Sequence, residues 1–302
     1  MSENRLKHIT VCICTYKRPA LLQELVHELI QQETKGLFTF SILVVDNDSL
    51  KSAEPAMAAE KATSPIPVMY FSEPRQNIAL ARNLAVENAD GDFVSFIDDD
   101  ELPVKTWLLS LFEALHAYKV DGVLGPVKPH FDDAAPEWVR KSKLYDRPSY
   151  PTGFVIDWRK GRTGNVLLKR EVFGSGGEYF RPEFRTGEDQ DFFRRMIEKG
   201  HKFIWCHEAM AYETVPPTRW NRSFILRRAL LRGATCLSHP TFGGKDIAKS
   251  LVAIPAYILT LPLALLAGQR WFMPLLVKLF DHLGRILAVL GINPVKEPYV
   301  TE

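Results

Sequence analysis

Short apolar runs alternate with segments of helical spacing through the first 125 residues, and this alternation restricts the fold more than any other feature of the chain. The apolar runs are rich in β-branched residues and end at polar clusters, which is typical of buried strands. The segments between them carry Leu or Ala every three or four positions, which predicts helices. The predicted strands are Ile9–Cys14, Phe40–Val45, Val68–Phe71, Phe93–Ile97 and one that begins at Gly122, and the predicted helices are Ala20–Gln31, Ala53–Ala62, Ala79–Asn88 and Trp107–Tyr118.

Alternating strands and helices with short connections predict an α/β fold, with a mostly parallel sheet covered by helices on both faces. Crossovers between parallel strands are right-handed, so the carboxyl ends of the strands share one edge, where ligands bind. Three of the first four strand ends carry polar clusters, at Thr15–Lys17, Asp46–Asp48 and Asp98–Glu101. We therefore expect the functional site at this edge.

The second half of the chain is less regular and then becomes helical. Residues 126–182 are rich in Pro, Gly and aromatic residues, whereas Glu188–Lys199 is a predicted helix and Lys202–Cys206 a predicted strand. From Trp220 onward the pattern changes to long apolar helices. The sequence thus predicts an α/β domain at residues 1–218 and a C-terminal helical region at residues 219–302.

The helical region contains a segment without charge, Ser250–Gln269, which is interrupted by Pro255 and Pro262. Its length is close to the roughly 20 residues that a membrane span needs. One interpretation is a membrane-associated region, such as an interfacial or re-entrant hairpin, and the other is a buried helical pair or dimer interface in a soluble protein. Basic residues on both sides favour the membrane, with both ends on the cytoplasmic face; they are Lys245, Lys249 and Arg270.

Charge is distributed unevenly along the chain. Residues 219–290 hold 10 Lys and Arg against 2 acidic residues, although the whole chain carries a formal net charge of only +2. An acidic body with a basic, apolar tail argues against nucleic-acid binding and is compatible with an anionic inner-membrane surface. The N-terminus lacks an apolar signal-peptide core, so we expect the body in a reducing cytoplasm.

The chain has four cysteines, which are too few and too scattered for a disulfide framework. Cys12 and Cys14 lie in a predicted buried strand without a second pair that could complete a metal site. Cys206 and Cys236 are isolated in the sequence. We expect no structural role for disulfides.

Asp98, Asp99, Asp100 and Glu101 follow the fourth predicted strand directly. Adjacent carboxylates raise one another's pKa unless a cation or hydrogen-bond donors compensate them. Mg²⁺ or Mn²⁺ prefers such oxygen ligands, and Asp98 and Asp100 would point the same way on an extended segment. A solvated turn is the alternative for the cluster alone, but its place beside two other polar strand ends favours a metal site.

Six segments together resemble family 2 glycosyltransferases, which are inverting enzymes with the Rossmann-like GT-A fold. The resemblance spans roughly residues 8–215, and its specificity comes from the order and spacing of segments that are weak individually. These segments are Val11–Arg18, Val44–Ser49, Asn77–Asn83, Phe96–Glu101, Thr163–Leu168 and Gly187–Phe192.

The resemblance implies a nucleotide-sugar site at the predicted sheet edge. Thr15 and Tyr16 would line the nucleotide pocket, and Asp46 would accept a hydrogen bond from the base or ribose, with Asp48 as a weaker candidate. Arg82, or alternatively Arg75, would approach the phosphates. The nucleotide-sugar set is Thr15, Tyr16, Arg18, Asp46, Asp48, Arg82, Asp98 and Asp99.

The resemblance also implies the catalytic groups. Asp189 matches the family's catalytic base, with Glu188 beside it, because an acceptor hydroxyl must lose its proton to attack the anomeric carbon. An N-terminal helix cap is the alternative for this pair. Asp98 and Asp100 match the outer positions of the Asp-x-Asp motif, and Asp100 is the preferred direct ligand of Mn²⁺ or Mg²⁺.

The chain departs from the family's pattern at the third metal ligand. Many relatives have a histidine after the strand that follows the base, where this chain has Tyr212, Glu213 and Thr214. Glu213 is the expected substitute, and His207 lies nearby. The aromatic residues Trp138, Tyr150 and Trp158 are alternatives for sugar stacking or for core packing.

The resemblance implies a UDP-sugar donor, and the apolar tail indicates a glycan or lipid-linked acceptor in bacterial surface-polysaccharide synthesis. A nucleotidyltransferase would normally show a Gly-rich loop after the first strand, where this chain has Thr15–Pro19. A phosphatase with an Asp nucleophile would normally carry its motif after the first strand, and a non-enzymatic membrane scaffold would need none of the acids. We therefore expect an enzyme at the cytoplasmic face of the cell membrane, peripheral or anchored by a hairpin.

Overall fold

The computed structural model describes residues 5–174, 176, 179–184, 186–235, 242–293 and 295. Cys236 and residues 1–4 of the predicted N-terminal segment lie outside these residues. The chain forms two compact units, the first from Met1–Lys128 and Arg147–Thr214 and the second from Pro129–Asp146 and Val215–Glu302. The predicted division of roles at residue 218 stays a prediction.

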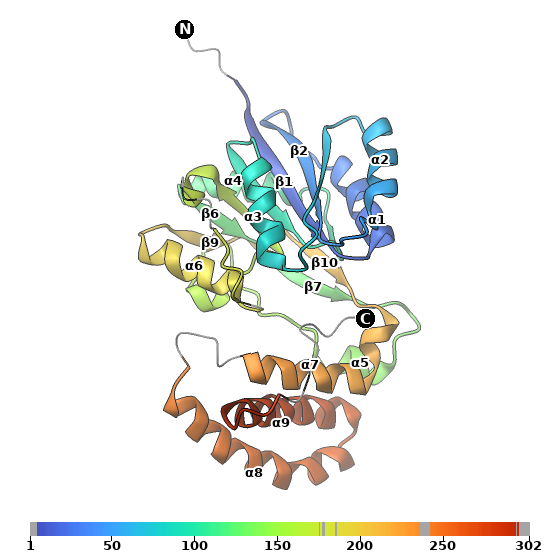
Figure 1. Ribbon diagram of the computed structural model, residues 1–302, viewed down its shortest axis with the longest axis vertical. Coiled ribbons are helices and arrows are strands. Elements are labelled where there is room, and N and C mark those ends of the chain that lie inside the picture. The colour runs from blue at the N-terminus through green and yellow to red at the C-terminus, as the bar shows by residue number, and fades with distance from the viewer. Residues whose placement is uncertain are drawn as a thin grey trace. The chain divides into compact units, whose positions relative to one another are not determined.

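A seven-stranded sheet forms the centre of the first unit, in the order β3-β2-β1-β4-β8-β6-β9 (Figure 1). Its strands run parallel except β8, which is antiparallel to both of its neighbours. A smaller sheet has the order β5-β10-β7. The strands are β1 (Lys7–Thr15), β2 (Phe38–Asp46), β3 (Val68–Ser72), β4 (Phe93–Ile97), β5 (Glu101–Pro103), β6 (Gly122–Leu124), β7 (Val127–His130), β8 (Asn165–Lys169), β9 (Phe203–Trp205) and β10 (Ala211–Thr214).

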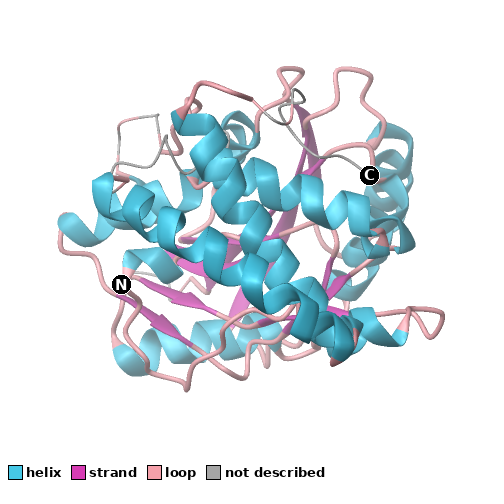
Figure 2. Cartoon of the chain, turned by 90° about the horizontal axis from the view of Figure 1, so that it is seen from below, coloured by secondary structure: helices cyan, strands magenta, loops and turns pink. Residues whose placement is uncertain are grey.

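Helices cover the strands on both sides (Figures 1 and 2). Successive residues of a strand point to opposite faces, so Ile9, Val11 and Ile13 join one apolar cluster and Cys12 joins the other. The first cluster includes side chains of α1, α2 and α4, and the second those of α3 and α6. The helices are α1 (Pro19–Ile30), α2 (Glu54–Thr63), α3 (Ile78–Asn88), α4 (Trp107–Tyr118) and α6 (Glu188–Glu198), with short 3-10 turns η1 (Trp158–Lys160) and η2 (Arg170–Phe173).

The predicted α/β class with a mostly parallel sheet is confirmed. The predicted ranges of β4 and α4 match the structure, and those of β1, β2, α1 and α3 differ by a few end residues. The irregular stretch of residues 126–182 supplies β7 and β8, which the sequence did not predict as strands. β8 lies between β4 and β6 in the sheet. Pairing between strands so far apart in the chain produces no local sequence pattern from which it could be predicted.

The second unit consists mainly of helices. It contains α5 (Glu137–Lys141), η3 (Pro217–Trp220), α7 (Arg222–Thr235), α8 (Gly244–Leu266) and α9 (Gln269–Val289). The α7 and α9 backbones approach closely, since a Cβ added to Gly284 would lie 2.3 Å from the Leu230 carbonyl oxygen. On α8, Ser250 and Ala264 are buried, whereas Leu259 and Leu263 are exposed.

The uncharged segment of the tail lies mostly in α8. The helix continues through Pro255 and Pro262 rather than ending at them, and it is drawn as a curved ribbon in Figure 1. Proline removes one backbone hydrogen bond and commonly bends a helix, which accounts for a curve without a break. Among the described residues, α8 is the helix that is long and apolar enough to cross a membrane, by length and composition alone.

Candidate active site

Three strand ends bring the predicted polar residues together at one edge of the large sheet. Thr15 at the end of β1 pairs in register with Asp46 at the end of β2. The acidic segment after β4 reaches the same edge, because the Thr15 hydroxyl donates a 2.7 Å hydrogen bond to Asp99 Oδ2. The expected convergence of these clusters is therefore present in the structure.

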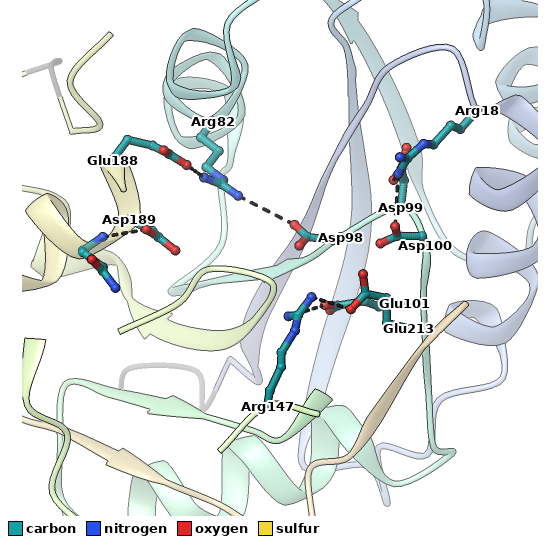
Figure 3. A network of polar contacts seen from close by, with 11 residues as sticks. Arg18, Arg82, Asp98, Asp99, Asp100, Glu101, Arg147, Glu188, Asp189 and Glu213 are labelled. Carbon is teal, nitrogen blue, oxygen red and sulfur yellow. Dashed lines mark hydrogen bonds and ion pairs between the residues drawn. The ribbon is translucent and has the colours of Figure 1, made fainter. Parts of the chain in front are cut away.

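Arg18 holds two acids of the cluster. Its Nη1 lies 3.1 Å from Asp99 Oδ1 and 3.1 Å from Asp100 Oδ2. Burial raises the pKa of Asp99 to about 6, although Arg18 and the Thr15 hydroxyl oppose this shift. Thr15, Arg18, Asp99 and Asp100 thus form one connected polar group (Figure 3 shows Arg18 and the two acids).

Asp46 is fully buried and organises the loop that follows β2. Its Oδ1 accepts from the backbone N–H of Asp48 at 3.0 Å. Its Oδ2 accepts from the Ala53 N–H at 2.8 Å and from the Tyr70 hydroxyl at 3.0 Å. Both oxygens are engaged within the protein, so this geometry favours a role in holding the loop that follows β2, and the predicted contact with base or ribose stays a prediction.

Asp98 lies between separate arginine groups (Figure 3). Arg82 Nη2 is 3.7 Å from Asp98 Oδ1, and the Asp98 side chain remains 42% exposed. On its other side, a Cβ added to Gly164 would lie 2.8 Å from Asp98 Oδ2 and 2.9 Å from Glu101 Oε1. Glycine at position 164 therefore leaves room for these two carboxylates beside the backbone.

Arg82 connects the acidic cluster to the predicted catalytic pair. It comes from α3, is 7% exposed, and forms an ion pair with Glu188 in the first turn of α6. Burial raises the pKa of Glu188, whereas the charge of Arg82 opposes that rise. Asp189 follows Glu188, is partly exposed, and accepts a hydrogen bond from the Gln190 N–H at 2.7 Å. Glu188, the residue before the predicted base, is thus linked to the acidic cluster through Arg82.

Glu101 and Glu213 face each other on neighbouring strands, β5 and β10. Arg147 bridges them, with Nη1 at 3.4 Å from Glu101 Oε1 and Nη2 at 2.5 Å from Glu213 Oε2. Burial raises the pKa of Glu101 well above its usual range. The sequence did not predict Arg147, because it lies in the irregular, proline-rich stretch where no local pattern indicates a partner.

Carboxylate oxygens are the ligand type that a hard divalent cation prefers. Arg18, Arg82 and Arg147 form ion pairs with six carboxylates of the described chain here, and Glu101 Oε2 is buried with no hydrogen-bond partner among the described residues. Within the described ranges, no three His, Cys, Asp or Glu residues already form a metal cage. Mg²⁺ commonly needs only one or two protein carboxylates, with phosphates and water completing its shell, so Asp98 and Asp100 fit such an ion.

The remaining predicted residues occupy varied surroundings. Tyr16 is partly exposed with the Lys17 ammonium 5.1 Å from its ring centre, and Arg75 forms a 2.8 Å ion pair with Glu73. His207 Nδ1 lies 3.2 Å from the Ser149 hydroxyl, and no contact with the acidic cluster is recorded for its side chain in the described part of the chain.

The aromatic residues considered for sugar stacking already have ring contacts. Tyr150 stacks on Phe154 with ring centres 4.5 Å apart, and Arg159 lies 4.3 Å from the centre of the Trp158 ring. Trp138 belongs to the second unit. Packing contacts are therefore present at Tyr150 and Trp158, and a sugar contact at any of the three stays a prediction.

Comparison with known proteins gives matches over most of the chain. Residues 10–203 match the family described as Glycosyl transferase family 2. The chain is 30% identical over 307 residues to the succinoglycan biosynthesis protein ExoM of Rhizobium meliloti (strain 1021), covering 97% of this chain and 96% of that protein. It is 24% identical to the hyaluronan synthase of Pasteurella multocida, covering 71% of this chain but 25% of that protein.

Solved structures show the same fold. The crystal structure of S. aureus TarS 1-349 in complex with UDP-GlcNAc superimposes with a TM-score of 0.53 at 13% identity, covering 95% of this chain and 93% of that one. GalNAc-T7 with UDP, GalNAc and Mn²⁺ gives a TM-score of 0.53 at 14% identity, covering 73% of this chain and 46% of that one. The predicted GT-A-like fold is confirmed, and the nucleotidyltransferase, phosphatase and scaffold alternatives are set aside. The chain is a glycosyltransferase and belongs to glycosyl transferase family 2.

Proposed function

We propose that this glycosyltransferase moves a sugar from a UDP-sugar to a hydroxyl group of a glycan or lipid-linked acceptor during the synthesis of a cell-surface polysaccharide. The similarity to ExoM, which is named for succinoglycan biosynthesis, extends over nearly the whole of both chains and supports the polysaccharide. The TarS structure is a complex with UDP-GlcNAc and the GalNAc-T7 structure one with UDP, which supports a UDP-sugar donor.

The observation that carries the proposed mechanism is the link through Arg82. Asp98 follows β4 and Glu188 begins α6, about ninety positions later, yet one buried guanidinium contacts both carboxylates. This link supports a position for Asp189, the next residue, near the acids that would bind the donor. A base must lie within hydrogen-bond reach of the acceptor hydroxyl while the donor is in place, and this arrangement suits that requirement.

Asp189 acts as the general base in this proposal. Its carboxylate takes the proton of the acceptor hydroxyl as the hydroxyl oxygen forms a bond to the anomeric carbon. The bond from that carbon to the diphosphate oxygen breaks on the opposite side, and the nucleoside diphosphate leaves with the electron pair. A single displacement of this kind inverts the anomeric centre. Glu188, paired with Arg82, fixes the start of α6 and thereby the position of Asp189.

Asp98 and Asp100 would hold Mn²⁺ or Mg²⁺, with Glu213 as the predicted third ligand. When bound, the ion would stabilise the charge that develops on the leaving diphosphate. Next to these proposed ligands, Asp99 accepts a hydrogen bond from Thr15 and forms an ion pair with Arg18. Tyr16, Asp46, Asp48 and Arg82 complete the proposed nucleotide-sugar set, in which Asp46 shapes the loop and Arg82 is already paired within the protein.

A thermal-shift comparison of nucleoside diphosphates, each with and without Mn²⁺, tests the donor and the metal together. A ligand of the folded state at 100 times its Kd adds about 2.7 kcal/mol of stability. We expect UDP to raise the melting temperature most, Mn²⁺ to increase that shift, and Asp100→Ala to remove the increase. Asp133→Ala, at an exposed acid in the second unit, is the control. Equal shifts for all diphosphates, or a Mn²⁺ effect that persists in Asp100→Ala, would contradict the proposal.

We also propose that the C-terminal helical region holds the enzyme at the cytoplasmic face of the membrane. Leu259 and Leu263 are 77% and 69% exposed on the uncharged part of α8. Exposed leucines in an uncharged helical segment with basic flanks suit insertion at an anionic interface. This places a lipid-linked acceptor and the enzyme on the same surface.

Vesicle flotation tests the membrane proposal. The wild-type chain should float with vesicles that contain anionic lipid, and the double variant Leu259→Glu with Leu263→Glu should remain in the soluble fraction. The matched control places glutamate at Leu50 and Val155, which are 81% and 69% exposed in the first unit. Equal flotation of both double variants would contradict membrane binding through α8.

A further inference from the structure

Arg147 is the cation of the site that neither the donor nor the metal proposal uses. It begins the second segment of the first unit, and its guanidinium lies between Glu101 and Glu213. These two glutamates are opposite each other across β5 and β10, and like charges in that position repel. Both are buried, at 0% and 6% exposure, so Arg147 compensates a repulsion that water cannot screen.

The field around Arg147 extends to the predicted metal ligands. Desolvation lowers the pKa of Arg147, but the charges of Glu213, Glu101, Asp98 and Asp100 raise it by more. Gly164 places Asp98 Oδ2 and Glu101 Oε1 close to the same point, so the Arg147 ion pair and the Asp98 carboxylate are neighbours. Arg147 is therefore close enough to the predicted metal ligands Asp98 and Asp100 to interact with both electrostatically.

The geometry of Arg147 suits anion binding rather than burial alone. Its side chain is 36% exposed, whereas the carboxylates of its two partners are 0% and 8% exposed. A guanidinium has five N–H donors in a planar fork, and the contacts to Glu101 and Glu213 use two of its nitrogens. Two carboxylates fix the orientation of the guanidinium. The Arg147 side chain therefore loses less conformational entropy when an anion binds to it.

We propose that Arg147 binds the diphosphate of the nucleotide-sugar donor through a guanidinium that Glu101 and Glu213 hold in position. Glu213 is then a positioning residue for Arg147 rather than the third metal ligand. This inference rests on the proposed donor, because a diphosphate must be part of it. Because Glu101 and Glu213 lie against the guanidinium, the contribution of Arg147 is directed hydrogen bonds to a metal-bound diphosphate rather than net positive charge.

Inorganic pyrophosphate in the presence of Mn²⁺ is the direct probe, because it carries the diphosphate without base or sugar. Calorimetric titration of the full chain should show binding to the wild type and binding about 10- to 100-fold weaker in Arg147→Met, the range expected for charge-assisted hydrogen bonds. Arg147→Lys should lie between them, since lysine keeps the charge but loses the fork. Arg232→Met removes an arginine paired with Asp281 in the second unit and should bind as the wild type does.

The affinity for Mn²⁺ alone, measured from free Mn²⁺ by electron paramagnetic resonance, separates the two roles of Glu213. We expect Glu213→Gln to weaken pyrophosphate binding about as Arg147→Lys does and to leave Mn²⁺ affinity within about threefold of the wild type. A tenfold loss of Mn²⁺ affinity in Glu213→Gln would instead make Glu213 a metal ligand and overturn its positioning role.

A double variant serves as the control for loss of folding. Arg147→Met leaves two buried carboxylates uncompensated, whereas Arg147→Met with Glu213→Gln removes one of them, so the double variant should melt closer to the wild type. Pyrophosphate binding at wild-type affinity in a folded Arg147 variant, or no binding by the wild type at millimolar concentration, would overturn the proposal. These titrations need no sugar transfer, so failure of the proposed reaction would be seen separately in a transfer assay.

Discussion

The Arg82–Glu188 ion pair should be the electrostatic contact that most affects the stability of the first unit. Arg82 and Glu188 are 7% and 6% exposed, and Arg82 also lies 3.7 Å from Asp98. Removing one member of a buried pair leaves an uncompensated charge, which typically costs about 3–5 kcal/mol. Arg82→Met should therefore destabilise the unit by that amount. Arg82→Met combined with Glu188→Gln leaves no buried charge at the pair and should cost about 1–2 kcal/mol.

The direction of the pH dependence follows from Glu188. Burial raises the pKa of Glu188 and Arg82 opposes that rise, so Arg82→Met should raise it further. A carboxyl whose pKa is higher in the folded state than in the unfolded state favours folding only when it is protonated. The stability lost in Arg82→Met should consequently be greatest at neutral pH and should recover partly as the pH falls toward 5.

Hydrogen exchange resolved to peptides from α3 and α6, together with urea unfolding, measures these effects within the first unit. Urea midpoints alone would mix the two units, since a chain of two compact units need not unfold in one step. A cost below about 1 kcal/mol for Arg82→Met, or a double variant as unstable as the sum of the two single variants, would refute the proposed coupling. So would a loss in Arg82→Met that grows as the pH is lowered.

Three further changes have expected outcomes. Gly164→Ala should leave the fold intact but reduce the Mn²⁺-dependent stabilisation by UDP, because its Cβ would lie 2.8 Å from Asp98 Oδ2. Gly176→Ala is the control: its Cβ would meet open space, so this variant should show the wild-type thermal shift. Asp46→Ala should lower the free energy of unfolding by about 3 kcal/mol in urea titrations, since it leaves buried donors unpaired; a change below 1 kcal/mol would argue against its role in the loop. Burial raises the pKa of the Cys206 thiol to about 12. Iodoacetamide at pH 8 should therefore label the Cys206 peptide at least about 100-fold more slowly in the native chain than in denaturant. Equal labelling rates would contradict that burial.

The sequence was sufficient to predict the parallel strands β1 to β4, the helices between them and the edge where three of these strands end in polar clusters. Buried parallel strands need nearly continuous apolar runs, and the residues of β1, β2 and β4 show them clearly. Because parallel strands end at one edge, the positions of Thr15, Asp46 and Asp98 followed from topology alone. The hydrogen bond that the Thr15 hydroxyl donates to Asp99 follows from this shared edge.

The partners of individual side chains could not be predicted in the same way. Asp46 was expected to face a nucleotide, but its two oxygens hold the following loop, a choice that depends on where Tyr70 and Ala53 lie. Glu213 was expected beside a metal, but its described ion pair is with Arg147, 66 positions away. Contacts between residues so distant in sequence depend on the packing of irregular segments, for which the sequence has no periodic pattern.

The most direct test is the rate of transfer of a labelled sugar from its UDP donor into the native cell-envelope fraction, measured for Asp189→Asn and the wild type. Loss of a general base typically costs about 10²- to 10⁴-fold, so kcat should fall in that range while the Kd for UDP with Mn²⁺ stays unchanged. Gln190→Ala, at the next position of α6, is the matched control and should retain activity within a few-fold. A kcat for Asp189→Asn within tenfold of the wild type would contradict Asp189 as the base.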